Sequence, residues 1–201
     1  DCLCKNDTPD IVLISGDLTY NGERTSHDEM KAALKKLQQK GKRVYVITAT
    51  HDYTTPRMPT YGIDKNDKYI EVESVNRTQL LKYYGDFGYN NAIAKHKSTM
   101  SYVAQLADGY RLFALNDDYG DPDCGFSDEL MNWVKTEANN AKRDGQYIIA
   151  MTHHPLVPPS PIYAAVAKGD MLNEYELRRN QLSDLGFDFV LTGHTHMHNI
   201  S

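Results

Sequence analysis

The sequence predicts a mixed α/β fold, and two observations support this prediction. Four short apolar runs are nearly continuous in Val, Ile and Leu, as expected of parallel strands that are buried on both faces. Stretches with the 3.6-residue periodicity of amphipathic helices separate these runs, which indicates strand–helix–strand crossovers in a layered fold. Each run ends in a small residue that is followed at once by carboxylate or imidazole side chains. The four runs, with their polar ends, are residues 11–17, 44–52, 147–154 and 189–196.

The first helix is expected after the first run. Ser26 and Glu29 have the spacing of a capping box, and Gly41 is a typical C-terminal stop. Between them, apolar residues recur on one helical face. These residues are Met30, Ala33, Leu34 and Leu37.

Two further helices precede the third and fourth runs. Ser127 is the expected N-cap of one, and Gly145 is its expected end. Its apolar stripe is Leu130, Val134, Ala138 and Ala141. The other helix is expected to begin after Asp170 and to end at Gly186. Before them, residues 100–107 and 110–115 have the pattern of a hairpin, joined at Asp108-Gly109.

Residues 53–98 interrupt this pattern and form a predicted insertion rich in tyrosine. The segment has six tyrosines, and a short helix is expected between Thr78 and Tyr84. Long irregular insertions often form the rim or lid of a functional site, and this one follows a polar strand end directly. The alternative is a packed surface excursion whose tyrosines are amphipathic. The pattern favours neither reading.

The composition and net charge of the sequence limit the classes of function that the protein can have. A chain of 201 residues with 40% hydrophobic content can bury the core of one globular domain, and we expect residues 1–201 to form a single one. The net charge of −5 argues against an extended nucleic-acid surface. No apolar stretch approaches the roughly 18 residues of a membrane span. The three cysteines do not distinguish a cytoplasmic from an exported protein, and the oligomeric state is open.

The residues at the strand ends are of the kinds that bind metal ions. In an extended segment, side chains two residues apart point the same way, so His194 and His196 can reach one metal cluster. His198 would continue this row, but a solvent-facing role is favoured for it. After the third run, His153 is preferred over His154 as a ligand, and His154 then lines the pocket or orients a partner.

Two earlier strand ends complete the predicted site. Asp17 is suited to bridge two divalent ions, although a turn-capping role would be the simpler explanation if it stood alone. His51 is suited to donate a proton, and the neighbouring Asp52 carboxylate is expected to fix its tautomer. The predicted reaction is attack by a metal-bound hydroxide on a phosphate ester, with leaving-group protonation by His51.

The order of these motifs resembles the calcineurin-like metallophosphoesterase superfamily. The resemblance rests on residues 16–22, 49–52, 153–155 and 193–196, and it covers nearly the whole chain. It implies a four-layer α/β/β/α sandwich and hydrolysis of phosphomonoesters or phosphodiesters with iron, manganese or zinc.

The resemblance also implies roles for individual residues. Asp17 matches the bridging aspartate and His51 the catalytic histidine. His153 and His194 match ligands of the second metal, and His196 matches a ligand of the first. The predicted catalytic residues are His51 and Asp52, and the predicted metal ligands are Asp17, Thr50, His153, His194 and His196. Asn21 and His154 are the predicted substrate-binding residues.

The sequence departs from the family pattern at two places. Thr50 stands where the family has an asparagine ligand, and a hydroxyl is a poorer metal donor than an amide oxygen. Residues 1–16 contain no Asp-x-His motif, and the chain stops soon after His196. We therefore expect a sandwich that is incomplete at both ends, with two divalent ions in the full-length protein and one or none in this chain.

The predicted function is hydrolysis of a small phosphate ester by a metal-dependent phosphoesterase. The alternative is a degenerate member of the same fold that binds a metal or ligand without catalysis. The retained histidines favour the enzyme, whereas Thr50 and the missing Asp-x-His motif favour the alternative.

Overall fold

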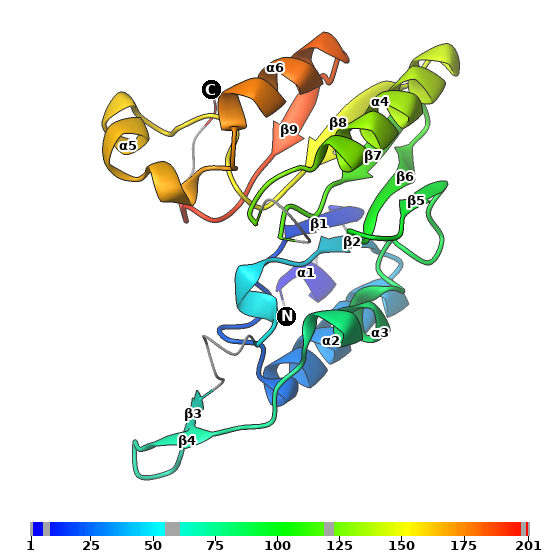
Figure 1. Cartoon of the computed structure of the whole chain (residues 1–201). Helices are drawn as coiled ribbons and strands as arrows, with labels where there is room; N and C mark the ends of the chain where they lie inside the picture. Colours follow the sequence, from blue (N-terminus) through cyan, green and yellow to red (C-terminus); the bar gives the residue numbers. More distant parts are fainter. Residues whose placement is uncertain (1, 6–8, 55–60, 119–122, 198–199, 201) are drawn as a thin grey trace. The chain divides into compact units, whose positions relative to one another are not determined.

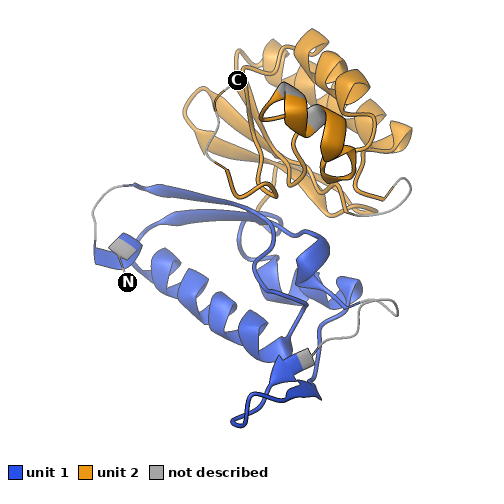
Figure 2. Ribbon diagram, turned by 90° about the vertical axis from the view of Figure 1, so that its left-hand side faces the viewer, with its two compact units in different colours: residues 1–90 blue, residues 91–201 orange. Residues whose placement is uncertain are grey.

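The computed structural model describes residues 2–5, 9–54, 61–118, 123–197 and 200. The chain divides into two compact units, residues 1–90 and 91–201 (Figure 2). Each unit contains a sheet that is covered by helices, so the predicted mixed α/β class is confirmed (Figure 1). No helix among the described residues has both the length and the apolar character needed to cross a bilayer.

Unit 1 is built on two parallel strands joined by a helical crossover. Ile11 pairs with Arg43 and Ser15 with Ile47, as predicted for the first two runs. Leu34 and Leu37 of the crossover helix are buried. The elements are α1 (Cys2–Lys5), β1 (Ile11–Ser15), α2 (Arg24–Gln39), β2 (Arg43–Ile47), η1 (Thr50–Asp52), β3 (Tyr61–Ile63), β4 (Tyr69–Glu71), η2 (Arg77–Gln79) and α3 (Leu80–Tyr84).

The start of α2 corrects one prediction. The helix begins at Arg24 with Glu23 as N-cap, so Ser26 lies inside it and the predicted capping box is wrong. The helix begins before the position that the local sequence predicts, and contacts from a distant part of the chain hold this earlier start. The Arg24 backbone N–H donates to the Glu73 carbonyl oxygen at 2.9 Å, and the two side chains form an ion pair at 2.8 Å.

Unit 2 contains a five-stranded sheet of order β5-β6-β7-β8-β9. Its first three strands are antiparallel, including the predicted hairpin around Gly109, and its last three are parallel. The elements are β5 (Ala94–His96), β6 (Ser101–Ala107), β7 (Tyr110–Ala114), α4 (Asp128–Arg143), β8 (Tyr147–Met151), α5 (Pro161–Val166), η3 (Lys168–Asp170), α6 (Tyr175–Asp184) and β9 (Phe189–Leu191).

Helix α4 carries the core of unit 2 and confirms its predicted limits. The Ser127 hydroxyl accepts a hydrogen bond from the Leu130 N–H at 3.2 Å, and Gly145 has the positive φ of a helix stop. All four residues of the predicted apolar stripe are buried in one cluster that includes Phe113 of β7 and Ile148 of β8. Helix α6 starts at Tyr175, five residues later than Asp170.

Two of the predicted parallel strands are less buried than their sequence suggests. All five residues of β1 are only half-buried, and Phe189 of β9 is exposed. Strand β1 has β2 as its one partner among the described strands, and β9 lies at an edge of its sheet. An edge strand is covered less than a central one, so apolar runs here do not imply full burial.

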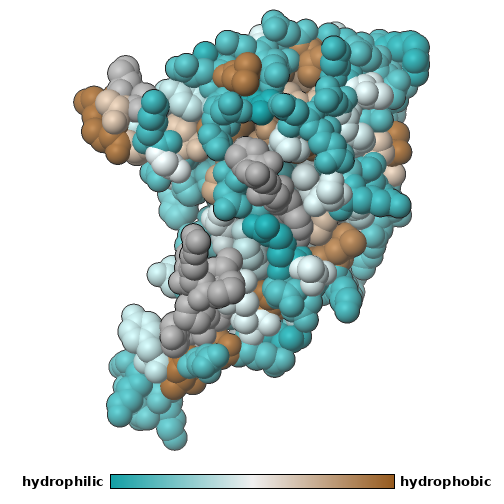
Figure 3. Space-filling view, viewed as in Figure 1, coloured by the Kyte–Doolittle hydropathy of each residue, from teal (hydrophilic) through white to brown (hydrophobic). Residues whose placement is uncertain are grey.

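Exposed apolar side chains gather on two short elements (Figure 3). On the β3–β4 hairpin, Ile63 and Tyr69 are exposed, and on α5 Ile162 and Val166 are exposed. The hairpin lies within the predicted insertion at residues 53–98. That segment also has buried tyrosines, so it contributes partly to the core of unit 1.

Candidate metal and catalytic site

The turn after β1 presents Asp17 at the carboxyl end of the strand. Gly16 and Asp17 both have positive φ, 97° and 53°, and aspartate is among the residues that tolerate this conformation. The Asp17 carboxylate oxygen Oδ1 accepts a hydrogen bond from the His51 backbone N–H at 3.2 Å. The ends of β1 and β2 therefore bring these two predicted site residues together within unit 1.

His51 has a defined tautomer. Its Nδ1 lies 2.6 Å from the Tyr20 carbonyl oxygen, which can only accept a hydrogen bond. Nδ1 therefore carries a proton, and Nε2 is the nitrogen that remains for chemistry. The Tyr20 ring also stacks beside the imidazole. His51 is half-buried.

Asp52 does not orient His51, and that prediction is wrong. The Asp52 side chain is buried, and its two oxygens accept the backbone N–H groups of Leu18, Thr19 and Ala49 at 2.6–3.0 Å. Burial raises the pKa of Asp52 to about 7, while the N–H groups limit the rise. Because these three partners are backbone groups, Asp52 joins the loop after β1 to the turn after β2.

His27 is a buried member of this network that the sequence reasoning missed. Its Nε2 lies 2.9 Å from the Asp52 carbonyl oxygen and its Nδ1 lies 2.5 Å from the Tyr84 hydroxyl. The carbonyl requires a donor, so the hydroxyl donates to Nδ1. Burial lowers the pKa of His27 and raises that of Tyr84. The sequence did contain a signal for its burial, because His27 lies on the same face of the helix as Leu34.

Gly22 is required where the two loops meet. It has φ 71°, and a Cβ atom there would lie 2.7 Å from the Tyr53 Cα. Its N–H donates to the His51 carbonyl oxygen at 2.9 Å. A glycine thus permits the close approach that sets the backbone of His51.

Unit 2 brings three imidazoles together. His153 and His154 follow β8, and His194 follows β9. The possible ligand atoms of these three residues, called the histidine cluster below, all lie within 4.8 Å of one another. His153 and His154 are buried and His194 is half-buried.

The histidine cluster fits a metal ion. His153 Nε2 and His194 Nδ1 lie 3.1 Å apart. Two imidazole nitrogens bound to one tetrahedral zinc ion at about 2.0–2.1 Å would be separated by about 3.3–3.4 Å, which is close to this distance. Imidazole is a preferred ligand for zinc and iron, so the donor set is suitable as well.

Asp117 anchors the histidine cluster, and the sequence reasoning missed it. Its Oδ2 accepts the Thr152 hydroxyl at 2.7 Å and the backbone N–H groups of His153 and His154 at 3.1 and 2.7 Å. Its Oδ1 lies 3.1 Å from His154 Nδ1. The available signal was its position just after β7, a strand interpreted as one arm of a hairpin.

Asp117 and His154 form a buried ion pair. Burial alone would raise the pKa of Asp117, but the hydrogen bond and charge of His154 hold it below its ordinary value. Burial alone would lower the pKa of His154, but hydrogen bonds to Asp117 and Cys124 raise it to about 10. His154 is thus held at its Nδ1 side by a carboxylate, as imidazoles near metal ions commonly are.

His196 is not a member of the histidine cluster. His194 and His196 both have positive φ, 66° and 53°, so the expected extended pair with parallel side chains is wrong. His196 is exposed, and His198 lies outside the described residues. Thr50 and Asn21, both half-buried, lie in unit 1 beside His51 and Tyr20 in the chain. Their predicted roles remain predictions.

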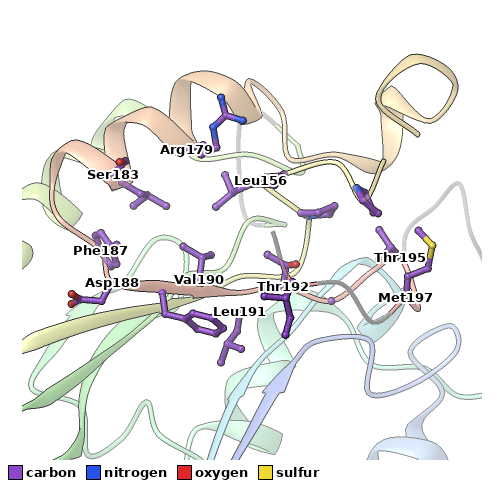
Figure 4. Close-up of a pocket in the computed structure, with 17 residues that line it drawn as sticks. Leu156, Arg179, Ser183, Phe187, Asp188, Val190, Leu191, Thr192, Thr195 and Met197 are labelled. Atoms are coloured by element: carbon purple, nitrogen blue, oxygen red, sulfur yellow. The ribbon is translucent and has the colours of Figure 1, made fainter. Parts of the chain in front are cut away.

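A cavity of about 360 Å³ lies beside the loop that carries His194 (Figure 4). Gly193 and Thr195, on either side of His194, both line it, together with Arg179 and Ser183 of α6. None of the described residues that line it belongs to the histidine cluster. The cavity therefore adjoins the cluster and does not contain it.

Comparisons with known proteins place the chain in a family and identify a solved structure with a similar fold. A family model of calcineurin-like phosphoesterases matches residues 1–198. Among solved structures, a dimetal phosphatase from Danio rerio is similar, with a TM-score of 0.61 and 13% identity over 93% of this chain and 67% of that chain. At that identity the likeness shows the fold alone. No curated protein sequence matches. The predicted fold class, mixed α/β of the metallophosphoesterase type, is confirmed. Because the family model spans nearly the whole chain, the chain belongs to the calcineurin-like phosphoesterase family.

Proposed function

We propose that the protein hydrolyses small phosphate esters with divalent metal ions. The observation that carries this proposal is the histidine cluster, whose donor atoms converge within 4.8 Å at the ends of two parallel strands. Such convergence is typical of a metal centre, because imidazole nitrogens are preferred ligands of zinc and iron and one ion can be shared by several of them.

The proposed ligands are distributed over four strand ends. His153 and His194 would hold one ion. The family resemblance further implies that Asp17, Thr50 and His196 would serve as metal ligands, and that His154 and Asn21 would bind the substrate. Divalent ions bound by these residues would supply positive charge that neutralises the phosphate and lowers the pKa of water. The net charge of −5 is compatible with an anionic substrate, because the ions dominate the local field.

His51 is the proposed general acid. Because Nδ1 is held by the Tyr20 carbonyl, the imidazolium can release only the Nε2 proton without breaking that hydrogen bond. In the proposed reaction Nε2 gives this proton to the leaving-group oxygen as its bond to phosphorus breaks. Asp52, His27 and Gly22 bind backbone groups around His51 and are proposed to position it.

A second candidate is a non-catalytic member of the family that binds a metal or ligand. Thr50 favours it, since the family carries an asparagine ligand at that position and a hydroxyl is the weaker donor. A member that binds a metal without catalysis would also hold an ion at the histidine cluster. Only the first predicts that the loaded protein releases phosphate.

We expect His194→Ala to weaken the tightest Zn²⁺ binding by at least about 100-fold. A ligand in contact with the ion should matter more than an outer partner, whose loss typically costs 10- to 100-fold. The affinity would be measured by competition with a chromophoric chelator. Circular dichroism would establish that the variant is folded.

The matched variant is His196→Ala. His196 lies outside the histidine cluster, so its loss should leave the tightest Zn²⁺ affinity within about threefold of the parent. Equal weakening in both variants would contradict the assignment of the tight ion to His153 and His194. Unchanged Zn²⁺ affinity in His194→Ala would show that the histidine cluster is not the tight metal site, and the proposed function would lose its main support.

A further inference from the structure

Tyr20 is an exposed tyrosine that is attached to His51 at two points. Its carbonyl oxygen accepts the hydrogen bond of His51 Nδ1 at 2.6 Å. Its ring stacks beside the imidazole, with 6.0 Å between ring centroids and 28° between planes. Nevertheless Tyr20 is 76% exposed. An aromatic surface therefore lies beside the proposed general acid and faces solvent.

Other tyrosines of unit 1 are buried, in contrast to Tyr20. Tyr53 and Tyr84 are 7% and 3% exposed, and both hydroxyls have hydrogen-bond partners. The backbone of Tyr20 is held by His51, and the neighbouring Thr19 N–H is held by Asp52. The ring is thus set on an anchored loop, which lowers the entropy cost of stacking a ligand on it.

We propose that Tyr20 binds the leaving group of the substrate, and that the enzyme prefers esters whose leaving group carries a planar ring, such as a nucleoside. This inference rests on the proposed function. If His51 protonates the leaving-group oxygen, the atoms that follow this oxygen begin beside the imidazole. The Tyr20 ring is the aromatic surface stacked against that imidazole, so a planar group extending from the oxygen can stack on it.

Stacking on the Tyr20 ring is not expected to discriminate between different planar leaving groups. Stacking uses the π-face that every nucleobase has, so the preference should be for a planar leaving group and not for one base. A sugar phosphate without a base has the same kind of alkoxide leaving group but nothing to stack. The comparison of these two substrates isolates the contribution of the ring.

The test is the ratio of kcat/KM for adenosine 5′-monophosphate to that for ribose 5-phosphate, in the metal-loaded chain. We expect the ratio to fall roughly 5- to 150-fold in Tyr20→Ala, the range that stacking on one aromatic side chain spans. Tyr20→Leu should lower it similarly, because it keeps an apolar side chain but has no π-face. Tyr20→Phe should restore most of it.

Tyr69→Ala is the matched control. Tyr69 is 78% exposed, in the same unit, on a hairpin that projects from the rest of that unit (Figure 1). Its substitution should leave the ratio unchanged. All these variants keep the backbone carbonyl of residue 20, so the hydrogen bond to His51 Nδ1 is retained.

The outcomes separate the two proposals. If the parent cleaves both substrates and the ratio is the same in Tyr20→Ala, the leaving-group role of Tyr20 is overturned and the phosphoesterase remains. Equal slowing on both substrates also leaves the ratio unchanged and has the same meaning. If the metal-loaded parent cleaves neither of these esters nor an activated aryl phosphate, the proposed function fails, and the role of Tyr20 fails with it.

Discussion

His51→Ala should reduce kcat about 10²- to 10⁴-fold without loss of metal. That range is the usual contribution of one general acid. The reduction should depend on the leaving group. It should be large for an alkyl phosphate, whose alkoxide needs a proton, and small for nitrophenyl phosphate, whose leaving group is stable as an anion. Steady-state rates on both substrates, together with metal analysis of the variant, check this expectation.

The alternatives for His51 give different results. Equal slowing on both substrates would assign His51 to phosphate binding and not to proton transfer. Loss of an ion in the variant would make His51 a metal ligand. His51→Gln is a useful companion, because it keeps a side chain of similar reach that cannot act as an acid at neutral pH.

Asp117→Ala should destabilise the protein by about 3–5 kcal/mol. Removing one partner of a buried ion pair leaves the other charge uncompensated, and effects of this size are typical. Here the carboxylate also accepts the Thr152 hydroxyl and two backbone N–H groups. Urea unfolding of the metal-free protein measures the loss. Asp117→Asn should cost less, because it keeps the shape and one acceptor oxygen.

The pH dependence of this stability has a definite sign. The folded-state pKa of His154 is raised from 6.5 to about 10, so its contribution is complete below pH 6.5 and is lost as the pH rises through 10. The pKa of Asp117 is lowered from 3.8, so its contribution is present above that value and is lost on acidification. In metal-free protein, the stability difference between the parent and Asp117→Asn should therefore be largest between about pH 4 and 6.5. A difference that does not fall by pH 10 would contradict the ion pair.

The sequence predicted strand ends better than side-chain roles. The order of elements, the parallel pairs β1–β2 and β8–β9, and the limits of α4 follow from local apolar periodicity, capping and glycine stops. Those signals depend on neighbours in the chain. The start of α2 depends instead on Glu73, about fifty residues away, and no local pattern contains that information.

Predictions of side-chain roles within the site were wrong where the backbone geometry determines what a side chain contacts. Asp52 was expected to orient His51, but the positions of the Leu18, Thr19 and Ala49 N–H groups determine what its carboxylate binds. Asp117 was missed because its partners are donors on another strand end, which sequence spacing does not relate to it. The pairing of His194 with His196 assumed an extended backbone, whereas both residues have positive φ.

Metal-dependent release of phosphate is the most direct test of the central claim. The purified chain would be stripped with a chelator, reloaded with Mn²⁺ or Zn²⁺, and assayed on nitrophenyl phosphate and bis(nitrophenyl) phosphate. We predict negligible hydrolysis in the stripped protein, hydrolysis of at least one ester after reloading, and none in His194→Ala under the same conditions. Hydrolysis that persists after stripping, or a protein that binds its ion in the histidine cluster and cleaves neither ester, would contradict the assignment of this chain as a metal-dependent phosphoesterase.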